Sequence, residues 1–443
     1  MSVTLYENAR LNGAAELTAI AVSDGRFLKF GKAQDLEHEF PDAKREDLGG
    51  NVVCPPFADA HIHLDYVYTA SLPTHETSSG TLFEAIDNWS DSKAKLSADA
   101  IRSRALKAVK MQISHGVQYV RTHVAVTDPK FSALKVMLEL KEQLKPYMQI
   151  QIVAFPQEGY YAYKGGDELV EEALKMGADV VGGIPHFEFT REDGVRSVKK
   201  GFELAEKYDK LLDFHCDETD DDQSRFVESI CAMTYYDGLQ GRTAASHTCA
   251  MGSYNNAYAF KMMSKFKKAQ LNFIVCPTEN CYLQGRYDSY PRRRGISRVD
   301  ELDQNGLNVS FAQDSISDPW YPLGNGNLMH QLDFGLHLSH MMSVEQISNS
   351  LRFVTTNGAK TMCVGDYGFK EGNSANFVVL DADNVFDAVR NTASTILSVR
   401  NGEVIMRKQP EKVLTEYGFL GELKCQSCMR SEGPSLSRAS TRL

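Results

Sequence analysis

Six side chains suited to metal binding or proton transfer follow apolar, strand-like runs of the sequence. They are His61, His63, His215, Glu218, His247 and Asp314. Residues i and i+2 of a strand point to the same face, so His61 and His63 place two imidazoles on one side. Three neutral imidazoles and one carboxylate suit one borderline divalent cation and leave a position open for water. Such an ion lowers the pKa of water from about 15.7 to about 7, and a carboxylate that is not a ligand can carry the proton.

A single ion is favoured over a pair. A binuclear site would need a bridging acidic group near the run 179–186, which offers no lysine for carboxylation. A lone histidine at the end of a strand is more often a structural residue than a ligand, but four such histidines in register with Glu218 and Asp314 indicate a site. His123 and His186 also end strand-like runs, and they are either structural residues or contacts of the ligands and substrate.

The elements that must position these residues are eight short apolar runs with helical stretches between them. The runs are Asn51–His63, Val117–Val126, Gln149–Gln157, Asp179–His186, Leu211–Glu218, Ala244–Ala250, Leu271–Asn280 and Leu307–Ser315. Helical spacing of apolar residues marks Leu169–Met176 and Val198–Tyr208. Eight alternations predict an α/β fold, a (β/α)₈ TIM barrel with its reactive residues at the C-terminal ends of the strands. A doubly wound open sheet is the alternative, but its Gly-rich phosphate turn would stand where Ala60–His63 stand.

The two ends of the chain read as short strands separated by turns. Asn401-Gly402 lies between two apolar runs and predicts a hairpin. We expect residues 1–55 and 365–423 to form one small β-sandwich domain and residues 56–364 to form the barrel. Residues 424–443 are polar and rich in serine, which predicts a disordered tail.

Composition excludes several classes of protein. The net charge of −10 over 443 residues argues against binding to nucleic acid, which needs basic side chains against phosphate. The sequence has no run of about 18 apolar residues that could span a membrane. Its first residues do not show the basic segment followed by an apolar core that marks a secretory signal, so we expect a cytoplasmic protein. Nine cysteines are too sparse for a disulfide scaffold and read as free thiols, with zinc or redox chemistry at Cys425-x-x-Cys428 as the alternative.

Several segments together resemble the metal-dependent cytosine deaminases of the amidohydrolase superfamily. The resemblance spans roughly residues 45–400 and is carried by His61–Asp65, Val153–Gly159, Ile184–Arg191, His215–Asp221, Ser246–Met251, Leu283–Arg286 and Asp318–Gly324. It implies an amidohydrolase-type barrel that releases ammonia from C4 of a free cytosine-type base. It also implies one divalent ion, iron or zinc, in each subunit of a homo-oligomer.

The resemblance assigns a role to each site residue. The metal ligands would be His61, His63, His215 and Asp314. Glu218 would be the proton shuttle between ring N3 and the leaving amino group, and His247 would orient the attacking hydroxide, whose proton Asp314 would take. Gln157 would hydrogen-bond the amide edge of the pyrimidine, because its side chain offers both a donor and an acceptor. Phe155 and Trp320 would form apolar walls for the ring.

Two departures from the family pattern bear on the substrate. Ser315 stands where the family has an aspartate near C5 of the base, and the loss of that charge would admit a C5 methyl group. We therefore expect 5-methylcytosine to be converted to thymine, with cytosine to uracil as a second reaction. The stretch Pro277–Leu283 is more acidic than in the family and is expected to reshape the rim of the site.

Two other functions stay open at this point. A deaminase of isoguanine or a hydrolase of creatinine would share the metal site and differ at Gln157 and in the loop after the eighth strand. A barrel kept as a binding scaffold would be catalytically silent, but it should have lost at least one metal or proton-transfer residue. All of these residues are present.

Overall fold

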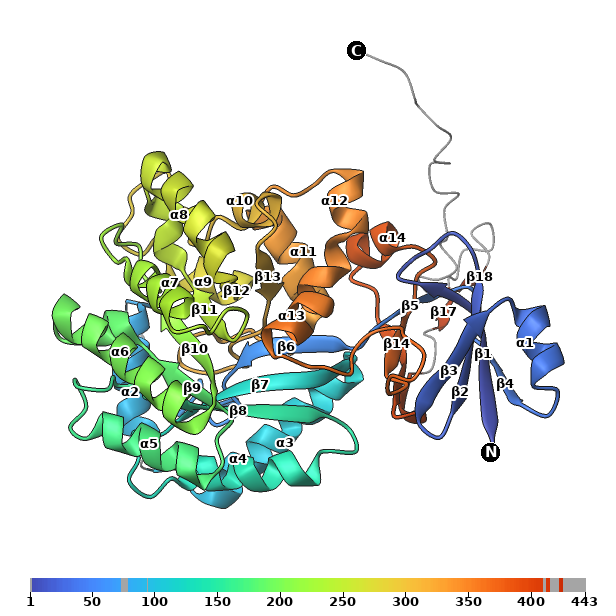
Figure 1. Cartoon of the computed structure of the whole chain (residues 1–443), viewed down its shortest axis with the longest axis horizontal. Helices are drawn as coiled ribbons and strands as arrows, with labels where there is room; N and C mark the ends of the chain where they lie inside the picture. The colour runs from blue at the N-terminus through green and yellow to red at the C-terminus, as the bar shows by residue number, and fades with distance from the viewer. Residues whose placement is uncertain (1, 73–78, 94, 409–411, 415–421, 425–443) are drawn as a thin grey trace, which may run out of the picture.

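The computed structural model describes residues 2–72, 79–93, 95–408, 412–414 and 422–424, and its main body is a barrel of parallel strands (Figure 1). The eight barrel strands are β6 (Phe57–Ile62), β7 (Val117–Ala125), β8 (Gln149–Phe155), β9 (Val180–Gly183), β10 (Leu211–Cys216), β11 (Thr243–His247), β12 (Asn272–Val275) and β13 (Asn308–Phe311). They are hydrogen-bonded in sequence order, and each neighbouring pair is parallel. All eight predicted runs therefore contain a barrel strand.

The first and last strands meet through a short bridge. Ile62 pairs with Asp314, and the Asp314 N–H donates to the His61 carbonyl oxygen over 2.8 Å. The sheet is thus a nearly closed TIM barrel, as predicted. Every residue of β7 is buried, which is the pattern of a parallel strand covered on both faces.

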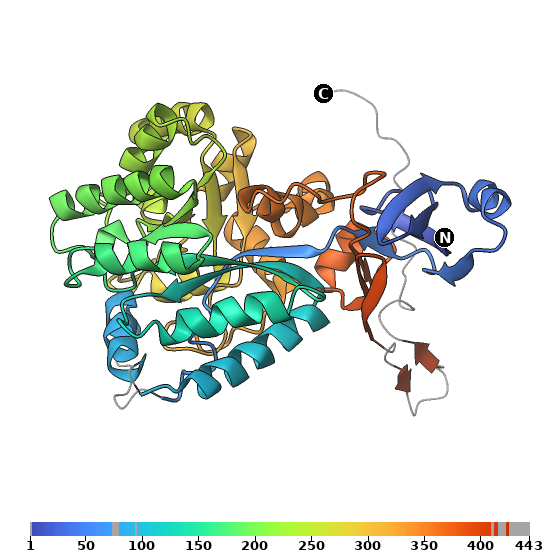
Figure 2. The ribbon, with the colours of Figure 1, turned by 60° about the horizontal axis from the view of Figure 1, so that its bottom comes forward.

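Helices surround the strands on the outside, as Figures 1 and 2 show. Between β6 and β13 the structure has α2 (Leu82–Lys93), α3 (Ala98–Ser114), α4 (Ser132–Gln143), α5 (Gly166–Met176), α6 (Arg191–Tyr208), α7 (Phe226–Tyr236), α8 (Asn256–Ala269), α9 (Pro277–Leu283) and α10 (Val299–Gln304). After β13 come α11 (Leu328–Leu338), α12 (Val344–Ser348), α13 (Thr356–Thr361) and α14 (Val385–Arg390), and three short 3₁₀ helices are η1 (Pro185–Phe187), η2 (Cys249–Ser253) and η3 (Ser350–Val354). The two predicted helices lie within α5 and α6.

Both ends of the chain build a second sheet beside the barrel (Figure 1). Its strands are β1 (Val3–Leu11), β2 (Thr18–Ser23), β3 (Arg26–Gly31), β4 (Lys44–Asp47), β5 (Val52–Cys54), β14 (Phe377–Leu380), β15 (Thr395–Arg400) and β16 (Glu403–Arg407), with α1 (Ala33–Glu39) between β3 and β4. Its two halves share one core, in which Tyr6 packs edge-on against Phe377 with ring centroids 5.0 Å apart. The separate sheet from both termini confirms the predicted fold class, while the exact domain boundaries stay a prediction.

Several local predictions have clear outcomes. The run Asn51–His63 contains two strands, because Pro55 and Pro56 interrupt the ladder, and β5 joins the small sheet while β6 joins the barrel. Asn401 and Gly402 form the turn between β15 and β16 with φ values of 49° and 76°. The seven cysteines that the structure describes are free thiols.

The last part of the chain is described only in fragments. β17 (Lys412–Leu414) pairs with β18 (Glu422–Lys424). The predicted tail 424–443 lies outside the described residues except for Lys424, and so do Cys425 and Cys428. Within the described residues, no helix has the length and apolar character needed to cross a membrane.

Candidate active site

The four predicted metal ligands meet at the C-terminal end of the barrel. They come from the ends of β6, β10 and β13, and each is at most 4% exposed. His63 Nε2 lies 3.1 Å from His215 Nε2, and Asp314 Oδ1 lies 3.5 Å from Nε2 of both His61 and His63. One carboxylate and three imidazoles therefore converge on a single point.

The chemistry of this donor set fits a divalent cation. Burial and the neighbouring imidazoles hold the pKa of His61, His63 and His215 well below the ordinary value, so all three are neutral, as metal ligands must be. His61 Nε2 and Asp314 Oδ2 are buried without a hydrogen-bond partner among the described residues. Burial, Glu218 and Asp318 raise the pKa of Asp314, and a cation beside it would stabilise its carboxylate. The cluster could therefore bind a metal ion.

The backbone turns sharply at three residues near the C-terminal ends of β10, β11 and β13. Asp217, His247 and Asp314 have φ values of 50°, 68° and 64°, in the left-handed region that non-glycine residues seldom adopt. Each such residue costs on the order of 1–3 kcal/mol, and this kind of strain gathers at functional sites. The fold accepts that cost to aim His247 and Asp314 into the centre of the barrel mouth.

Glu218 faces the same centre and is 3% exposed. Its Oε1 lies 3.5 Å from His247 Nδ1, and Glu218, His247 and Asp314 bring their side-chain atoms within 4.8 Å of one another. Burial and the charge of Glu279 raise the pKa of Glu218 well above its ordinary value. The side chain can therefore hold a proton near neutral pH, as a proton shuttle must.

Asp217 anchors the turn that carries Glu218. Its Oδ1 accepts hydrogen bonds from the Ser224 hydroxyl and the Phe226 N–H over 2.7 and 2.9 Å, and its Oδ2 accepts from the Val227 N–H over 2.9 Å. These bonds cap the first turn of α7 and hold the loop after β10.

We expect Asp217→Ala to lower the free energy of unfolding by about 2–4 kcal/mol, because it leaves several buried donors unpaired. Urea unfolding followed by circular dichroism measures the change. The exposed Asp221→Ala in the same loop is the matched control and should stay within about 0.5 kcal/mol of the unmodified protein. Equal midpoints for the two variants would contradict the anchoring role.

His247 is held in a different way from the three histidines predicted as metal ligands. The Cys276 N–H donates to Asn280 Oδ1 over 3.1 Å, so the Asn280 amide turns its Nδ2 toward His247 Nδ1, 3.0 Å away. That Nδ1 must accept, and the proton of the neutral ring therefore lies on Nε2. Because Nε2 is buried without a partner among the described residues, His247 is equipped to donate a hydrogen bond rather than to ligate a metal.

A small cavity opens onto the cluster. Its wall is formed by His63, Tyr66, Leu82, Gln157, Ile184, His215, Glu218, His247, Glu279, Asp314 and Trp320. Gln157 Oε1 is buried without a partner among the described residues, and Tyr66 stacks on Trp320 with ring centroids 4.4 Å apart. The cavity thus combines an aromatic wall with a free amide oxygen, and it contains two of the four predicted substrate contacts, Gln157 and Trp320.

The other two predicted contacts, Phe155 and Ser315, are buried beside the cavity and do not form part of its described wall. The Phe155 ring stacks on the His215 ring, with centroids 4.0 Å apart and an interplanar angle of 18°. Phe155 therefore supports the imidazole of a predicted metal ligand. Ser315 follows Asp314 at the closure of the barrel, where its carbonyl oxygen accepts a hydrogen bond from Gln313 Nε2 over 2.9 Å.

Glu279 lies in the wall of the cavity, a position that the sequence did not predict. The acidic stretch Pro277–Leu283 was expected at the rim, but Glu279 is 3% exposed and lies in the cavity wall. Burial and the charges of Asp314 and Asp318 raise its pKa well above the ordinary value, and the neighbouring Ser315 lowers it. The family pattern drew attention to this stretch, but only the start of α9 directly after β12 explains why the carboxyl points inward.

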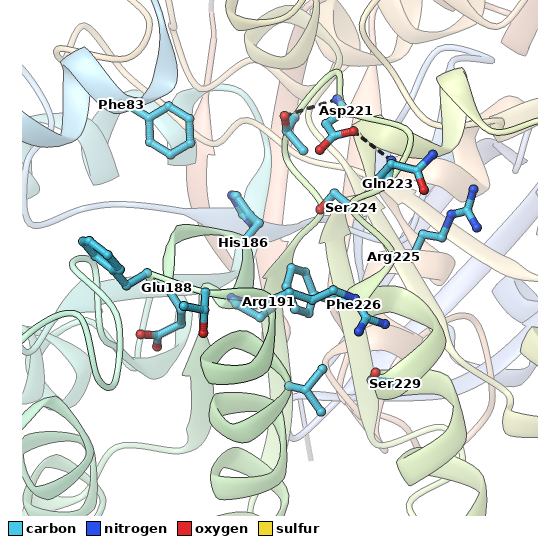
Figure 3. A pocket seen from close by; sticks show the side chains of 15 residues that line it. Phe83, His186, Glu188, Arg191, Asp221, Gln223, Ser224, Arg225, Phe226 and Ser229 are labelled. Atoms are coloured by element: carbon cyan, nitrogen blue, oxygen red, sulfur yellow. Dashed lines mark hydrogen bonds between the residues drawn. The ribbon is translucent and has the colours of Figure 1, made fainter.

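A larger pocket of about 410 Å³ lies next to this cavity, at the ends of β9 and β10 (Figure 3). Figure 3 shows His186 between Phe83 and the loop that carries Ser224 and Arg225. Among the described residues, His186 belongs to no group that could hold a metal ion, whereas His123 lies close enough to His61 and His63 for the three imidazoles to hold one together. His123 stacks on His61 at 3.9 Å and lies 3.7 Å from Asp213 Oδ2, so it supports the site from below.

Comparison with known proteins gives the same picture. The 5-methylcytosine deaminase from Klebsiella pneumoniae, solved with 5-fluorocytosine, is 47% identical, covers 93% of this chain and 99% of its own, and superposes with a TM-score of 0.89. The enzyme of that name and organism solved with phosphonocytosine is 46% identical over 94% of this chain and all of its own, with a TM-score of 0.88. The N-isopropylammelide isopropyl amidohydrolase of Pseudomonas sp. (strain ADP) is 27% identical over 412 residues, 91% of this chain and 97% of that protein.

These similarities confirm the predicted resemblance to cytosine deaminases. The model of the family described as amidohydrolase matches residues 45–407, which include every residue of the cluster. By this match and by its barrel and buried His/Asp cluster, the chain belongs to the amidohydrolase family.

Proposed function

We propose that this chain hydrolyses the C4 amino group of a free cytosine-type base, converting 5-methylcytosine to thymine and, as a second reaction, cytosine to uracil. The proposal rests on one observation: Glu218 and the His/Asp cluster face the same small cavity as Gln157. The extensive similarity to a protein named 5-methylcytosine deaminase supports the choice of substrate.

The proposed metal centre holds one Fe²⁺ or Zn²⁺ ion on His61, His63, His215 and Asp314. Such an ion supplies hydroxide at neutral pH by lowering the pKa of water. His61, His63 and His215 hold the ion as neutral ligands, and Asp314 adds one negative charge. Its second oxygen, Oδ2, lies 3.7 Å from His247 Nδ1 and is placed to take the proton of the attacking water.

The side chains around the cavity then divide the remaining work. Gln157 binds the amide edge of the base and orients C4 toward the cluster, while Trp320 covers the ring. Glu218 gives a proton to N3, which makes C4 more electrophilic, and His247 Nε2–H stabilises the oxygen that adds to C4. Glu218, now ionised, takes the hydrogen of the hydroxyl added at C4 and passes it to the amino group. The C4–N bond breaks as the C4=O bond forms, and one ammonia leaves for each water consumed. The proton held by Asp314 then returns Glu218 to its acid form.

A C5 methyl group is expected to fit because Ser315 replaces a charged side chain of the family pattern. An ionised carboxylate next to a methyl group would lose hydration without gaining a partner, whereas a serine hydroxyl is small and neutral. Glu279, in α9 directly after β12, places another carboxyl in the wall of this cavity. Its raised pKa favours the neutral acid. We therefore expect the site to accept the methyl group.

The experiment that tests this function is ammonia release by the metal-reconstituted protein from four bases, namely cytosine, 5-methylcytosine, isoguanine and creatinine. We expect release from the first two, with 5-methylcytosine giving the higher kcat/KM. A tenfold preference for cytosine would overturn the argument from Ser315 and leave the deaminase assignment intact. Release only from isoguanine or creatinine would replace the proposed substrate by one of these alternatives, and silence on all four would favour a binding scaffold.

Ser315→Asp should reverse the preference between the two pyrimidines. A methyl group in a fitted pocket contributes about 1–3 kcal/mol, so the ratio of kcat/KM for 5-methylcytosine over cytosine should fall by about 10- to 200-fold. Ser315→Ala, which stays small and neutral, is the matched control and should keep the original ratio. If the aspartate variant also keeps it, Ser315 does not set specificity.

The setting of the reaction is also a proposal. The free base is expected to be the substrate rather than nucleic acid, because the net charge is −10 and the cavity is enclosed by buried side chains. We propose a cytoplasmic enzyme that works as a homo-oligomer. Size-exclusion chromatography with light scattering measures the oligomeric state.

A further inference from the structure

A continuous chain of hydrogen bonds runs from His61 into the interior of the barrel. His61 Nδ1 lies 2.8 Å from the Ser246 Oγ, and that hydroxyl lies 2.7 Å from Asp213 Oδ1. Arg121 Nη1 donates to the other oxygen, Asp213 Oδ2, over 2.8 Å. All four side chains have no exposed surface. The residues come from β6, β11, β10 and β7, so the chain crosses the barrel below the metal cluster.

Arg121 fixes the inner end of this chain. Its Nη2 donates to the Thr361 carbonyl oxygen over 2.9 Å, and its Nε donates to Gln151 Oε1 over 3.1 Å. Gln151 in turn donates to the Met362 carbonyl oxygen over 2.7 Å. The guanidinium is thus tied to the backbone at the end of α13, and it holds the Asp213 carboxylate in one position.

The order of donors and acceptors along the chain has one consistent solution. The Asp213 carboxylate, paired with Arg121, can only accept, so the single Ser246 hydroxyl hydrogen points to Asp213. Toward His61 the same hydroxyl oxygen can then only accept. His61 must therefore carry its proton on Nδ1, and the lone pair of its Nε2 points to Asp314 Oδ1, 3.5 Å away.

We propose that Ser246 and Asp213 are positioning residues, which preset His61 as a metal ligand by fixing its ring orientation and its Nδ1–H tautomer. The proposal rests on the metal centre of the proposed function and is independent of which base is the substrate. Neither Ser246 nor Asp213 contacts the point where the ligands converge, so their effect passes through His61. Partners of this kind typically change metal affinity by about 10- to 100-fold when they are removed.

The other ligand histidines lack such a device. His63 Nδ1 and His215 Nδ1 are buried without a hydrogen-bond partner among the described residues. His247 has the opposite arrangement, because Asn280 donates to its Nδ1. Of His61, His63, His215 and His247, His61 is therefore the one whose described neighbours fix the tautomer. They leave its Nε2 lone pair free before an ion binds.

The test is the Zn²⁺ dissociation constant of the metal-free protein, measured by competition with a chromophoric chelator. Ser246→Ala and Asp213→Asn should weaken Zn²⁺ binding by about 10- to 100-fold, since the asparagine amide would donate to Ser246 and turn the serine hydrogen toward His61. Ser246→Thr keeps the hydroxyl and should bind Zn²⁺ nearly as tightly as the unmodified protein. Ser310→Ala is the matched control, because Ser310 is a fully buried barrel-strand serine whose hydroxyl donates to the Phe273 carbonyl oxygen over 3.4 Å and to no ligand histidine among the described residues.

A Ser246→Ala affinity within twofold of Ser310→Ala would overturn the proposal. The ¹⁵N spectrum of histidine-labelled, metal-free unmodified protein provides a second readout that needs no variant to fold. It should show His61 protonated at Nδ1, and protonation at Nε2 would equally overturn the proposal. If the unmodified protein bound no Zn²⁺ at all, the metal centre itself would fail, while the tautomer measurement would still decide the hydrogen-bond chain.

Discussion

His215→Ala should release the metal ion and lower ammonia production from 5-methylcytosine to the uncatalysed background. His215 supplies one of the three imidazoles, and its Nε2 lies 3.1 Å from that of His63, so removing it opens the ligand set on the side facing β10. The loss should amount to the whole catalytic effect, about 10⁶-fold or more for an enzyme of this kind. Metal content by mass spectrometry and ammonia release in the same sample measure both consequences.

The exposed His337→Ala on α11 is the matched control, because it removes an imidazole that lies 63% exposed outside the cluster. It should keep one ion per chain and full activity. Phe155 packs on His215, so circular dichroism must show that the His215 variant is folded. A folded His215→Ala protein that keeps one tightly bound ion and its activity would contradict the assignment of this histidine as a ligand.

Glu218→Gln should keep the metal ion and lose about 10²- to 10⁴-fold in kcat, the range that positioned proton transfer contributes. Glutamine has nearly the same shape as glutamate, but it cannot carry a proton from N3 to the leaving amino group. It also removes a carboxyl whose negative charge raises the pKa of Asp314. Substrate binding should therefore be preserved or improved while turnover falls.

Steady-state kinetics with metal analysis of each sample measure this difference. Glu203→Gln on the exposed face of α6 is the matched control and should leave both parameters unchanged. His215→Ala and Glu218→Gln thus separate two roles, because one variant loses the ion and the other keeps it. A Glu218→Gln protein with more than a tenth of the original kcat would show that another group moves the proton.

Much of the fold could be predicted from the sequence because the barrel strands are buried on both faces. Each appears as a short apolar run, as in Ile150–Phe155, and the number of runs matches that of a closed barrel. The bounds of the strands were predicted less exactly than their number. Asn51–His63 reads as one apolar run, and only the two prolines at its centre indicate that it serves two sheets.

The meeting of the His and Asp side chains at one end of the barrel was predictable for the same reason. The C-terminal ends of parallel strands meet at one end of a barrel, so residues that follow separate runs are brought together whatever the side-chain packing. The inner arrangement depends on that packing. Phe155 turns behind His215, Glu279 turns into the cavity, and Ser246 lies beneath His61, because strand register and the start of α9 decide which way each side chain points.

The most direct test of a one-metal deaminase is a titration of the metal-free protein with Zn²⁺ or Fe²⁺, with ammonia release from 5-methylcytosine measured at each addition. We expect no activity without metal, then a linear rise in ammonia release, and a sharp plateau at one ion per chain, with one thymine formed for each ammonia. Full activity of the metal-free protein, or a plateau reached only at two ions per chain, would contradict it.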